Sequence, residues 1–144
     1  MKRAMVLFCA FCLTSIAPFP LQADDIVRDG VFVHISHGSD DPHRLLMALN
    51  MAKIMAADHD VLVYIDIKGV DAVLKDSPDI TYSHFPSSRT QFSALLNKGA
   101  TLMVCPGCLK AAGKSREDVA AGIQIADKKA FFNFTKGRIL SLDY

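Results

Sequence analysis

Hydrophobic positions change their spacing repeatedly along the chain, which predicts strands and helices in alternation. Short apolar runs typical of buried strands occupy residues 31–36 (VFVHIS), 61–67 (VLVYIDI), 100–104 (ATLMV), 123–126 and 139–144. Apolar residues at helical spacing predict helices at 42–56, 69–75, 90–98, 115–122 and 127–137. Asp41 followed by Pro42 is a typical helix start, and residues 79–88 show no period, so we expect a loop there.

Strands joined by helices favour parallel pairing through right-handed crossovers. Five such strands fit a three-layer α/β fold, an open flavodoxin-like sheet of strand order 2-1-3-4-5 flanked by helices. In that order the winding reverses between the first and third strands, and ligands bind beyond the carboxyl ends of the strands at such a reversal. The loops at 36–41 and 105–108 are therefore expected to meet in one crevice. Asp66 ends the second strand as either a crevice carboxylate or a helix cap.

The first 23 residues have the three-part layout of a secretory signal peptide. Lys2 and Arg3 precede an uncharged, mostly apolar stretch at 4–17, and Ala23 offers a small residue for cleavage. That stretch is shorter than the roughly 20 residues needed to cross a bilayer, so we expect cleavage; an uncleaved signal anchor is the alternative. The mature protein is then a single domain at 24–144, periplasmic or secreted, with no stable membrane anchor.

Composition narrows the function classes further. The formal net charge of the whole chain is only +1, and Lys2 and Arg3 leave with the signal, so no basic surface favours nucleic acid. Of the four cysteines, Cys9 and Cys12 leave too, which excludes a disulfide-scaffolded mini-protein. The loop HGSDDPH at 37–43 lacks the glycines of a dinucleotide-binding motif, and its aspartates repel phosphate. We therefore expect no nucleotide or flavin cofactor.

The remaining cysteines, Cys105 and Cys108, flank Pro106-Gly107 directly after the third predicted strand. The thiolate is the reactive form, and its pKa falls when the first sulfur lies near a helix N-terminus and the second donates to it. Residues 109–112 (LKAA) are good helix formers, so the motif can begin a helix. We interpret Cys105 as a nucleophile. A plain structural disulfide is the alternative, because an exported protein meets an oxidising compartment.

Two histidines are candidates for the same site. His37 follows the first strand and is expected to act beside the cysteines, while His84 lies in the long loop, and long loops are often functional. With Cys105 and Cys108 they would form a four-ligand set for Zn²⁺ or Cu⁺, although no spacing proves a metal site. His34, inside the first strand, is expected to be a buried imidazole with its hydrogen bonds satisfied.

Five segments resemble the DsrE-like proteins, a family related to subunits of bacterial sulfur-relay complexes. They cover nearly the whole mature chain, at 37–44 (HGSDDPHR), 64–76 (YIDIKGVDAVLKD), 83–88 (SHFPSS), 105–114 (CPGCLKAAGK) and 131–144 (FFNFTKGRILSLDY). The resemblance implies a flavodoxin-like sheet, a homo-oligomer that is trimeric or hexameric, and a cysteine beyond a central strand that carries persulfide sulfur. Cys105 resembles that carrier, and Cys108 is an added partner. Relay members work in the cytoplasm, so the export signal argues against that particular relay.

Two function classes follow from these observations. The first is an exported thiol-dependent sulfur carrier or sulfurtransferase that meets a sulfur donor or a thiol partner protein. In it Cys105 is the persulfide-bearing nucleophile, Cys108 the resolving thiol, and His37 or Lys110 tunes their charge. The second is a non-catalytic module for metal or a small ligand, with a structural Cys105–Cys108 disulfide. A plain disulfide oxidoreductase comes third, because no thioredoxin-like order of elements surrounds the motif.

Overall fold

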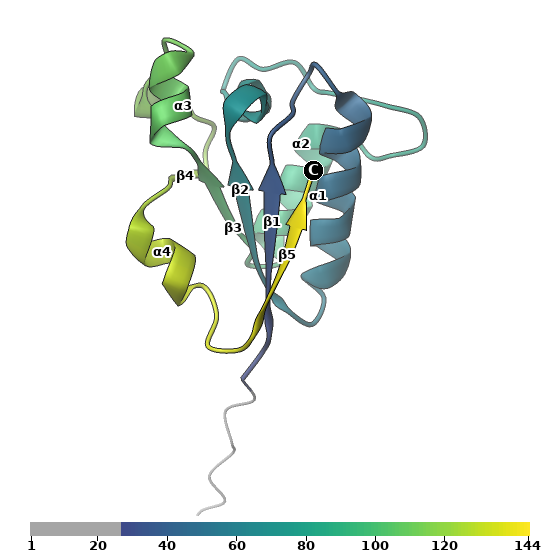
Figure 1. The fold of residues 1–144 in the computed structure, drawn as a ribbon. Coiled ribbons are helices and arrows are strands. Elements are labelled where there is room, and N and C mark those ends of the chain that lie inside the picture. The colour runs from purple at the N-terminus through teal and green to yellow at the C-terminus, as the bar shows by residue number, and fades with distance from the viewer. Residues whose placement is uncertain (1–26) are drawn as a thin grey trace, which may run out of the picture.

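A computed structural model describes residues 27–144 as one parallel sheet with helices on both faces (Figure 1). The predicted signal peptide lies outside the described residues. The strands are β1 (Gly30–Ile35), β2 (Asp60–Ile65), β3 (Thr101–Val104), β4 (Gln124–Ile125) and β5 (Ile139–Asp143). The helices are α1 (Pro42–Met55), α2 (Ser88–Asn97), α3 (Pro106–Ala111), α4 (Lys128–Asn133) and the 3-10 helices η1 (Ile67–Val73) and η2 (Arg116–Asp118).

The sheet confirms the predicted α/β class but has a different strand order. Its strands run β4-β3-β2-β1-β5, all parallel, so the expected order 2-1-3-4-5 is wrong. The reason lies in the helices, since α1 and α2 pack side by side on one face (Figure 1). Right-handed crossovers on one face step the chain in a single direction, from β1 through β2 to β3. Periodicity does not reveal which face a helix covers.

In the observed strand order, the winding reverses at a different pair of strands from the predicted pair. The chain reverses between β1 and β5, whereas β2 lies between β1 and β3. The loop after β1 therefore does not meet the loop after β3 at a switch point, as the sequence had predicted. Instead, the end of β2 is the direct neighbour of Cys105, whose amide donates to the carbonyl of Ile65 at 2.9 Å.

The two faces of the sheet are buried to different extents. One face carries the main core, where Val33 and Ile65 are fully buried with Leu49 of α1 and Leu95 of α2. The other face carries half-buried aromatic side chains against which the short helix α4 packs. Its Phe131 lies 6.0 Å from the ring of Phe32 and 5.0 Å from the ring of Tyr64. This second face is the one that leads to the cysteines.

Several predicted elements differ from the prediction in helix type or in length. The helix expected at 69–75 is the 3-10 helix η1, the one expected at 115–122 is reduced to η2, and β4 has two residues. Ser115 and Asp118 form the capping arrangement at η2. Within residues 27–144, no helix has the length and apolar character needed to cross a membrane.

Candidate functional site

Cys105 is the residue at which β3 passes into α3. Its backbone continues the ladder to β2, and its side chain caps α3, because Sγ accepts a hydrogen bond from the amide of Cys108 at 3.3 Å. Pro106 fills the first helical position, where a missing amide costs nothing. Cys108 thus lies in the first helical turn and both sulfurs face the same turn of backbone, as the sequence predicted. Both side chains are half-buried free thiols.

One apolar side chain anchors α3. Leu109 is 2% exposed and packs in the main core, and Cys108 packs against that core beside it. The helix ends after six residues at Ala111, and Gly113 follows with a φ of 68°, in the left-handed region that favours glycine. The position of the thiols therefore depends on a short helix with a single deep anchor.

Tyr64 supplies a hydroxyl to the thiols from the neighbouring strand. It lies on the second face of β2, and its hydroxyl is the largest of the influences that lower the pKa of Cys105. The ring is held between Phe131, which meets it edge-on, and His34, which stacks on it at 5.8 Å. Burial, followed by the bond to Cys105, raises the pKa of Tyr64 far above its usual value. Tyr64 therefore remains a protonated donor at neutral pH.

Hydrogen bonds separate the two thiols in acidity. For Cys105, burial opposes ionisation, but bonds from Tyr64, from the amide and thiol of Cys108 and from the amide of Gly107 outweigh it and lower its pKa. For Cys108, burial and donation to Cys105 raise the pKa, against one bond from the amide of Ile67. The pair therefore holds its first negative charge on Cys105, stabilised by neighbouring donors.

Beside the thiols, the ends of three strands bring together one histidine and two carboxylates. His34 Nε2 lies 2.9 Å from Asp66 Oδ1, and His34 Nδ1 lies 3.0 Å from Asp143 Oδ1. Asp66 makes no cap bond with its side chain, so the cap interpretation of this residue is not supported, and its carboxylate pairs with His34 instead. The imidazole of His34 is satisfied as expected, although it is half-buried rather than fully buried.

Comparisons with known proteins agree with this fold. A family model, that of the DsrE/DsrF-like family, matches residues 29–137. The chain belongs to the DsrE/DsrF-like family. No curated protein matches the sequence.

Two solved structures resemble this DsrE/DsrF-like chain. The YchN protein from E. coli aligns with a TM-score of 0.59 and 13% identity, over 81% of this chain and 100% of its own. MTH1491, a protein of unknown function from Methanobacterium thermoautotrophicum, aligns with a TM-score of 0.53 and 18% identity, over 78% of this chain and 98% of its own. At such identities the likeness shows the fold alone.

In this family member, His37 has partners of its own. Its Nδ1 lies 2.9 Å from Asp40 Oδ2, and Asp40 also pairs with Lys68 at 3.3 Å. The amide of Gly38 donates to the same carboxylate and is the main cause of its strongly lowered pKa. The structure thus bonds His37 to Asp40 and places His34, rather than His37, against Tyr64.

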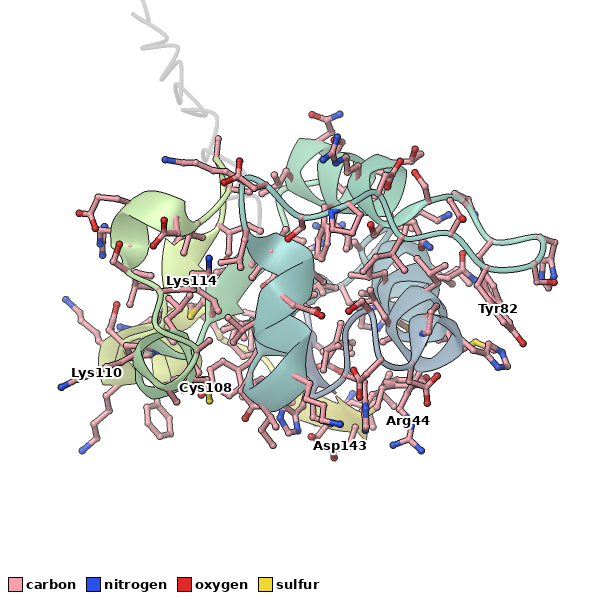
Figure 2. The ribbon with its side chains drawn as sticks, turned by 90° about the horizontal axis from the view of Figure 1, so that it is seen from above. Arg44, Tyr82, Cys108, Lys110, Lys114 and Asp143 are labelled. Carbon is pink, nitrogen blue, oxygen red and sulfur yellow. The ribbon has the colours of Figure 1, made fainter. Side chains whose placement is uncertain are left out.

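The predicted four-ligand metal set is not assembled. His84 is exposed, with its ring 4.5 Å from that of Phe85, and the same loop carries Tyr82, which stacks on His43 at 4.9 Å. Figure 2 shows Tyr82 on the far side of the carboxyl edge from Cys108. Across residues 27–144, no group of three or more histidine, cysteine, aspartate or glutamate side chains is placed to hold a metal ion.

The sequence pointed to the cysteines but not to the side chains that surround them. Tyr64 carried no signal beyond its place two residues before Asp66 in a strand. Strand alternation puts residues 64 and 66 on one face, but only the observed order puts that face beside Cys105. Lys110 was expected to tune the thiols, and it points outward from α3 in Figure 2.

Proposed function

We propose that this DsrE/DsrF-like protein is an exported, thiol-dependent sulfur carrier or sulfurtransferase. Cys105 is the nucleophile that bears the persulfide, and Cys108 is the resolving thiol. One observation carries the proposal: Cys105 caps the start of α3, where its Sγ accepts from the amide of Cys108 at 3.3 Å, and this position lowers the pKa of Cys105 while burial raises that of Cys108 in the same turn. Such a division is what a two-thiol carrier needs, because one sulfur must attack a donor while the other stays protonated in reserve.

In the first step the Cys105 thiolate takes sulfur from a donor. Its Sγ attacks the outer sulfur of a persulfide or thiosulfate, a new S–S bond forms, and the donor's S–S bond breaks. The electron pair leaves with the donor as a thiolate or as sulfite. Tyr64 and the amides of Gly107 and Cys108 hold Sγ in place for this attack.

In the second step the bound sulfur leaves by one of two routes. An acceptor thiol can attack the outer sulfur and regenerate the Cys105 thiolate. Alternatively, Cys108 attacks Sγ of Cys105, which forms a disulfide and releases the outer sulfur as hydrosulfide, so that the two cysteines are oxidised and the sulfane sulfur is reduced. A dithiol partner then returns the pair to its reduced state.

Sulfide release from a loaded protein tests this function. The reduced protein is mixed with inorganic polysulfide, freed of excess donor, and treated with a small thiol while hydrosulfide is measured. We expect about one hydrosulfide per chain from the unaltered protein and none from Cys105→Ser. Cys108→Ser is expected to load normally and to release sulfide only when the external thiol is added. Equal release from both variants would contradict the assignment.

The alternative is a non-catalytic module with a structural disulfide. It is favoured by the contact between the two thiols, because neighbouring cysteines in an oxidising compartment readily form a stable bond. In that case the disulfide is isolated with the protein, and mild dithiol reductants leave it intact. The sulfur-carrier proposal expects the opposite, a disulfide that these reductants open readily.

Export is part of the proposal. The motivation is the charged start at Lys2 and Arg3, the apolar stretch that follows, and the small residue Ala23. Cell fractionation followed by amino-terminal sequencing is expected to find a chain that begins at Asp24 outside the cytoplasm. An intact Met1 in the cytosolic fraction would remove export from the account.

A further inference from the structure

Asp66, His34 and Asp143 form a continuous chain of hydrogen-bonding side chains across three strand ends. His34 lies on β1, the middle strand of the three, and its register partners are Tyr64 on β2 and Asp143 on β5. Each ring nitrogen meets a different carboxylate, at 2.9 Å to Asp66 and 3.0 Å to Asp143. The observed strand order makes this arrangement, since only a strand between β2 and β5 reaches both.

These three side chains lead from the neighbourhood of the thiols to the solvent. They are increasingly exposed, 17% for Asp66, 27% for His34 and 70% for Asp143. At the inner end, Asp66 directly precedes Ile67, whose backbone amide acts on Cys108 and opposes the rise in its pKa. At the outer end, Asp143 and His34 line an open groove of about 520 Å³. Figure 2 shows Cys108 and Asp143 on opposite sides of η1 at this edge.

The imidazole in this chain holds an exchangeable proton. A neutral imidazole has one donor and one acceptor nitrogen, so two carboxylate partners require an imidazolium or a proton on one carboxyl group. Burial opposes the charged ring, but the bonds to Asp66 and Asp143 outweigh burial and raise the pKa of His34. The other ionisable residues around the ring are Tyr64, stacked on it, and Arg44 and Tyr144, which line the same groove.

The second step of the proposed reaction needs an acceptor for the proton of Cys108. Once Cys105 is bonded to a second sulfur, its Sγ no longer takes up the proton of Cys108. Tyr64 already carries its own proton, and burial keeps it there. The carboxylate of Asp66 is the acidic side chain whose charge acts on Cys108. Asp66 also directly precedes Ile67 at the end of β2 and bonds to His34, so it is the candidate acceptor for a proton that leaves Cys108.

We propose that Asp66, His34 and Asp143 are a proton relay that carries the proton of Cys108 to solvent when Cys108 attacks Cys105. This rests on the proposed function, in which Cys108 is the resolving thiol. Asp66 takes the proton from Cys108 directly or through one water, neutral His34 takes it from Asp66, and Asp143 passes it outward. Asp66 acts on the reacting sulfur, while His34 and Asp143 are positioning residues that act through it.

The two thiol steps can be timed separately with 4,4′-dithiodipyridine. Cys105 attacks the probe and releases one thiopyridone, leaving a mixed disulfide on Cys105. Cys108 then attacks Sγ of Cys105, closes the protein disulfide and releases a second thiopyridone. Absorbance therefore shows two phases, and the second phase alone depends on removal of the Cys108 proton.

The relay predicts a selective loss of the second phase. Asp66→Asn is expected to slow it by about 100-fold, a usual contribution of general base catalysis, with the first phase changed less than about twofold. In the unaltered protein the second-phase rate should rise with pH through the raised pKa of His34 and then level off. In His34→Gln and Asp143→Asn this rise of the second-phase rate with pH should be lost. Added imidazole should restore part of the second-phase rate.

The same variants distinguish the relay from simple electrostatics. The charge of Asp66 raises the pKa of Cys108, so an electrostatic role alone predicts that Asp66→Asn speeds the second phase. A faster or unchanged second phase in Asp66→Asn and His34→Gln, both folded by circular dichroism, would overturn the relay and leave the resolving role of Cys108 intact. A missing second phase in the unaltered protein would overturn both.

A matched control is available elsewhere in the chain. His59 and Asp58 form the same kind of pair at 2.7 Å, just before β2 and therefore at the opposite edge of the sheet. His59→Gln is expected to leave both phases and their pH profile unchanged. A shift of the second phase in this variant equal to that in His34→Gln would show that the effect is not specific to the relay.

Discussion

At the scale of single residues, the two thiols differ because each has different neighbours. Cys105 accepts from Tyr64 and from backbone amides at the start of α3, whereas Cys108 donates to Cys105 and lies beside the end of β2. Donors near one sulfur stabilise its thiolate, and burial without matching donors disfavours the other. Their positions in the same turn therefore give them different chemistry.

Tyr64→Phe tests the largest of these stabilising contacts. The substitution keeps the packing against Phe131 and His34 and removes only the hydroxyl that donates to Cys105. We expect alkylation of Cys105 at neutral pH to slow by about 3- to 10-fold, the effect of losing one partly exposed hydrogen bond to a charged group. Alkylation mapped by mass spectrometry measures it, with the slower labelling of Cys108 as internal reference. Unchanged labelling of Cys105 would show that Tyr64 does not tune it.

Sequence reasoning could identify the cysteines because their chemistry is local. A C-x-x-C motif before a helix-forming segment predicts a capped thiol from neighbours in the chain alone. Tyr64 and His34 could not be found in this way, since their contacts with the site come from separate strands. His37 was chosen from its place at a strand end, but such a place does not specify which neighbour its ring meets, and the ring meets Asp40.

At the scale of elements, α3 transmits stability to the site. Leu109 is its one buried residue, so Leu109→Ala is expected to cost about 2–5 kcal/mol and to loosen the turn that holds both sulfurs. The pKa difference between the two thiols should then shrink. Leu49→Ala in α1, also fully buried, is the matched control.

The control separates stability from site geometry. Leu49→Ala should lower the free energy of unfolding by a similar amount, about 2–5 kcal/mol, and leave the thiol reactivities as they are. Chemical denaturation measures the first quantity and pH-dependent alkylation the second. Equal loss of thiol selectivity in both variants would mean that α3 has no special part in the site.

His34 joins the ends of β1, β2 and β5, and this predicts a pH dependence of stability. Its pKa is raised in the folded protein, so its contribution is fully present below the unfolded value of about 6.5. The contribution is lost as pH rises through the higher folded pKa. We expect the free energy of unfolding to fall as pH rises above about 6.5 and through the raised folded pKa, less so in His34→Gln. A profile that is the same in both proteins would contradict the charged ring.

The strand order is a feature that the hydrophobic pattern could not predict. Apolar runs identified β1, β2 and β3 and predicted parallel pairing, because a strand buried on both faces is apolar throughout. The same runs are compatible with several orders. The order depends on α1 and α2 sharing one face, which comes from packing between segments more than 30 residues apart, and it decides which side chains meet the thiols.

At the scale of the whole molecule, we propose a homo-oligomer, trimeric or hexameric. The edge strand β5 exposes Ile139 and Leu140 by about half of their surface, and Phe132 of α4 is 72% exposed. Light scattering at micromolar concentration is expected to give the mass of a trimer or a hexamer. Leu140→Asp should shift the protein toward smaller species. A monomer in the unaltered protein would contradict the proposal.

The central claim is that Cys105 carries sulfur and Cys108 discharges it, and intact-mass analysis after a short pulse of polysulfide tests it most directly. Cys108→Ser is expected to gain the mass of one sulfur atom, located on Cys105 by fragmentation, and to keep it. The unaltered protein should gain the same mass transiently and then lose two hydrogens as the disulfide closes, while Cys105→Ser gains nothing. Sulfur retained on Cys108 in Cys105→Ser, or no gain in any of the three proteins, would contradict the account.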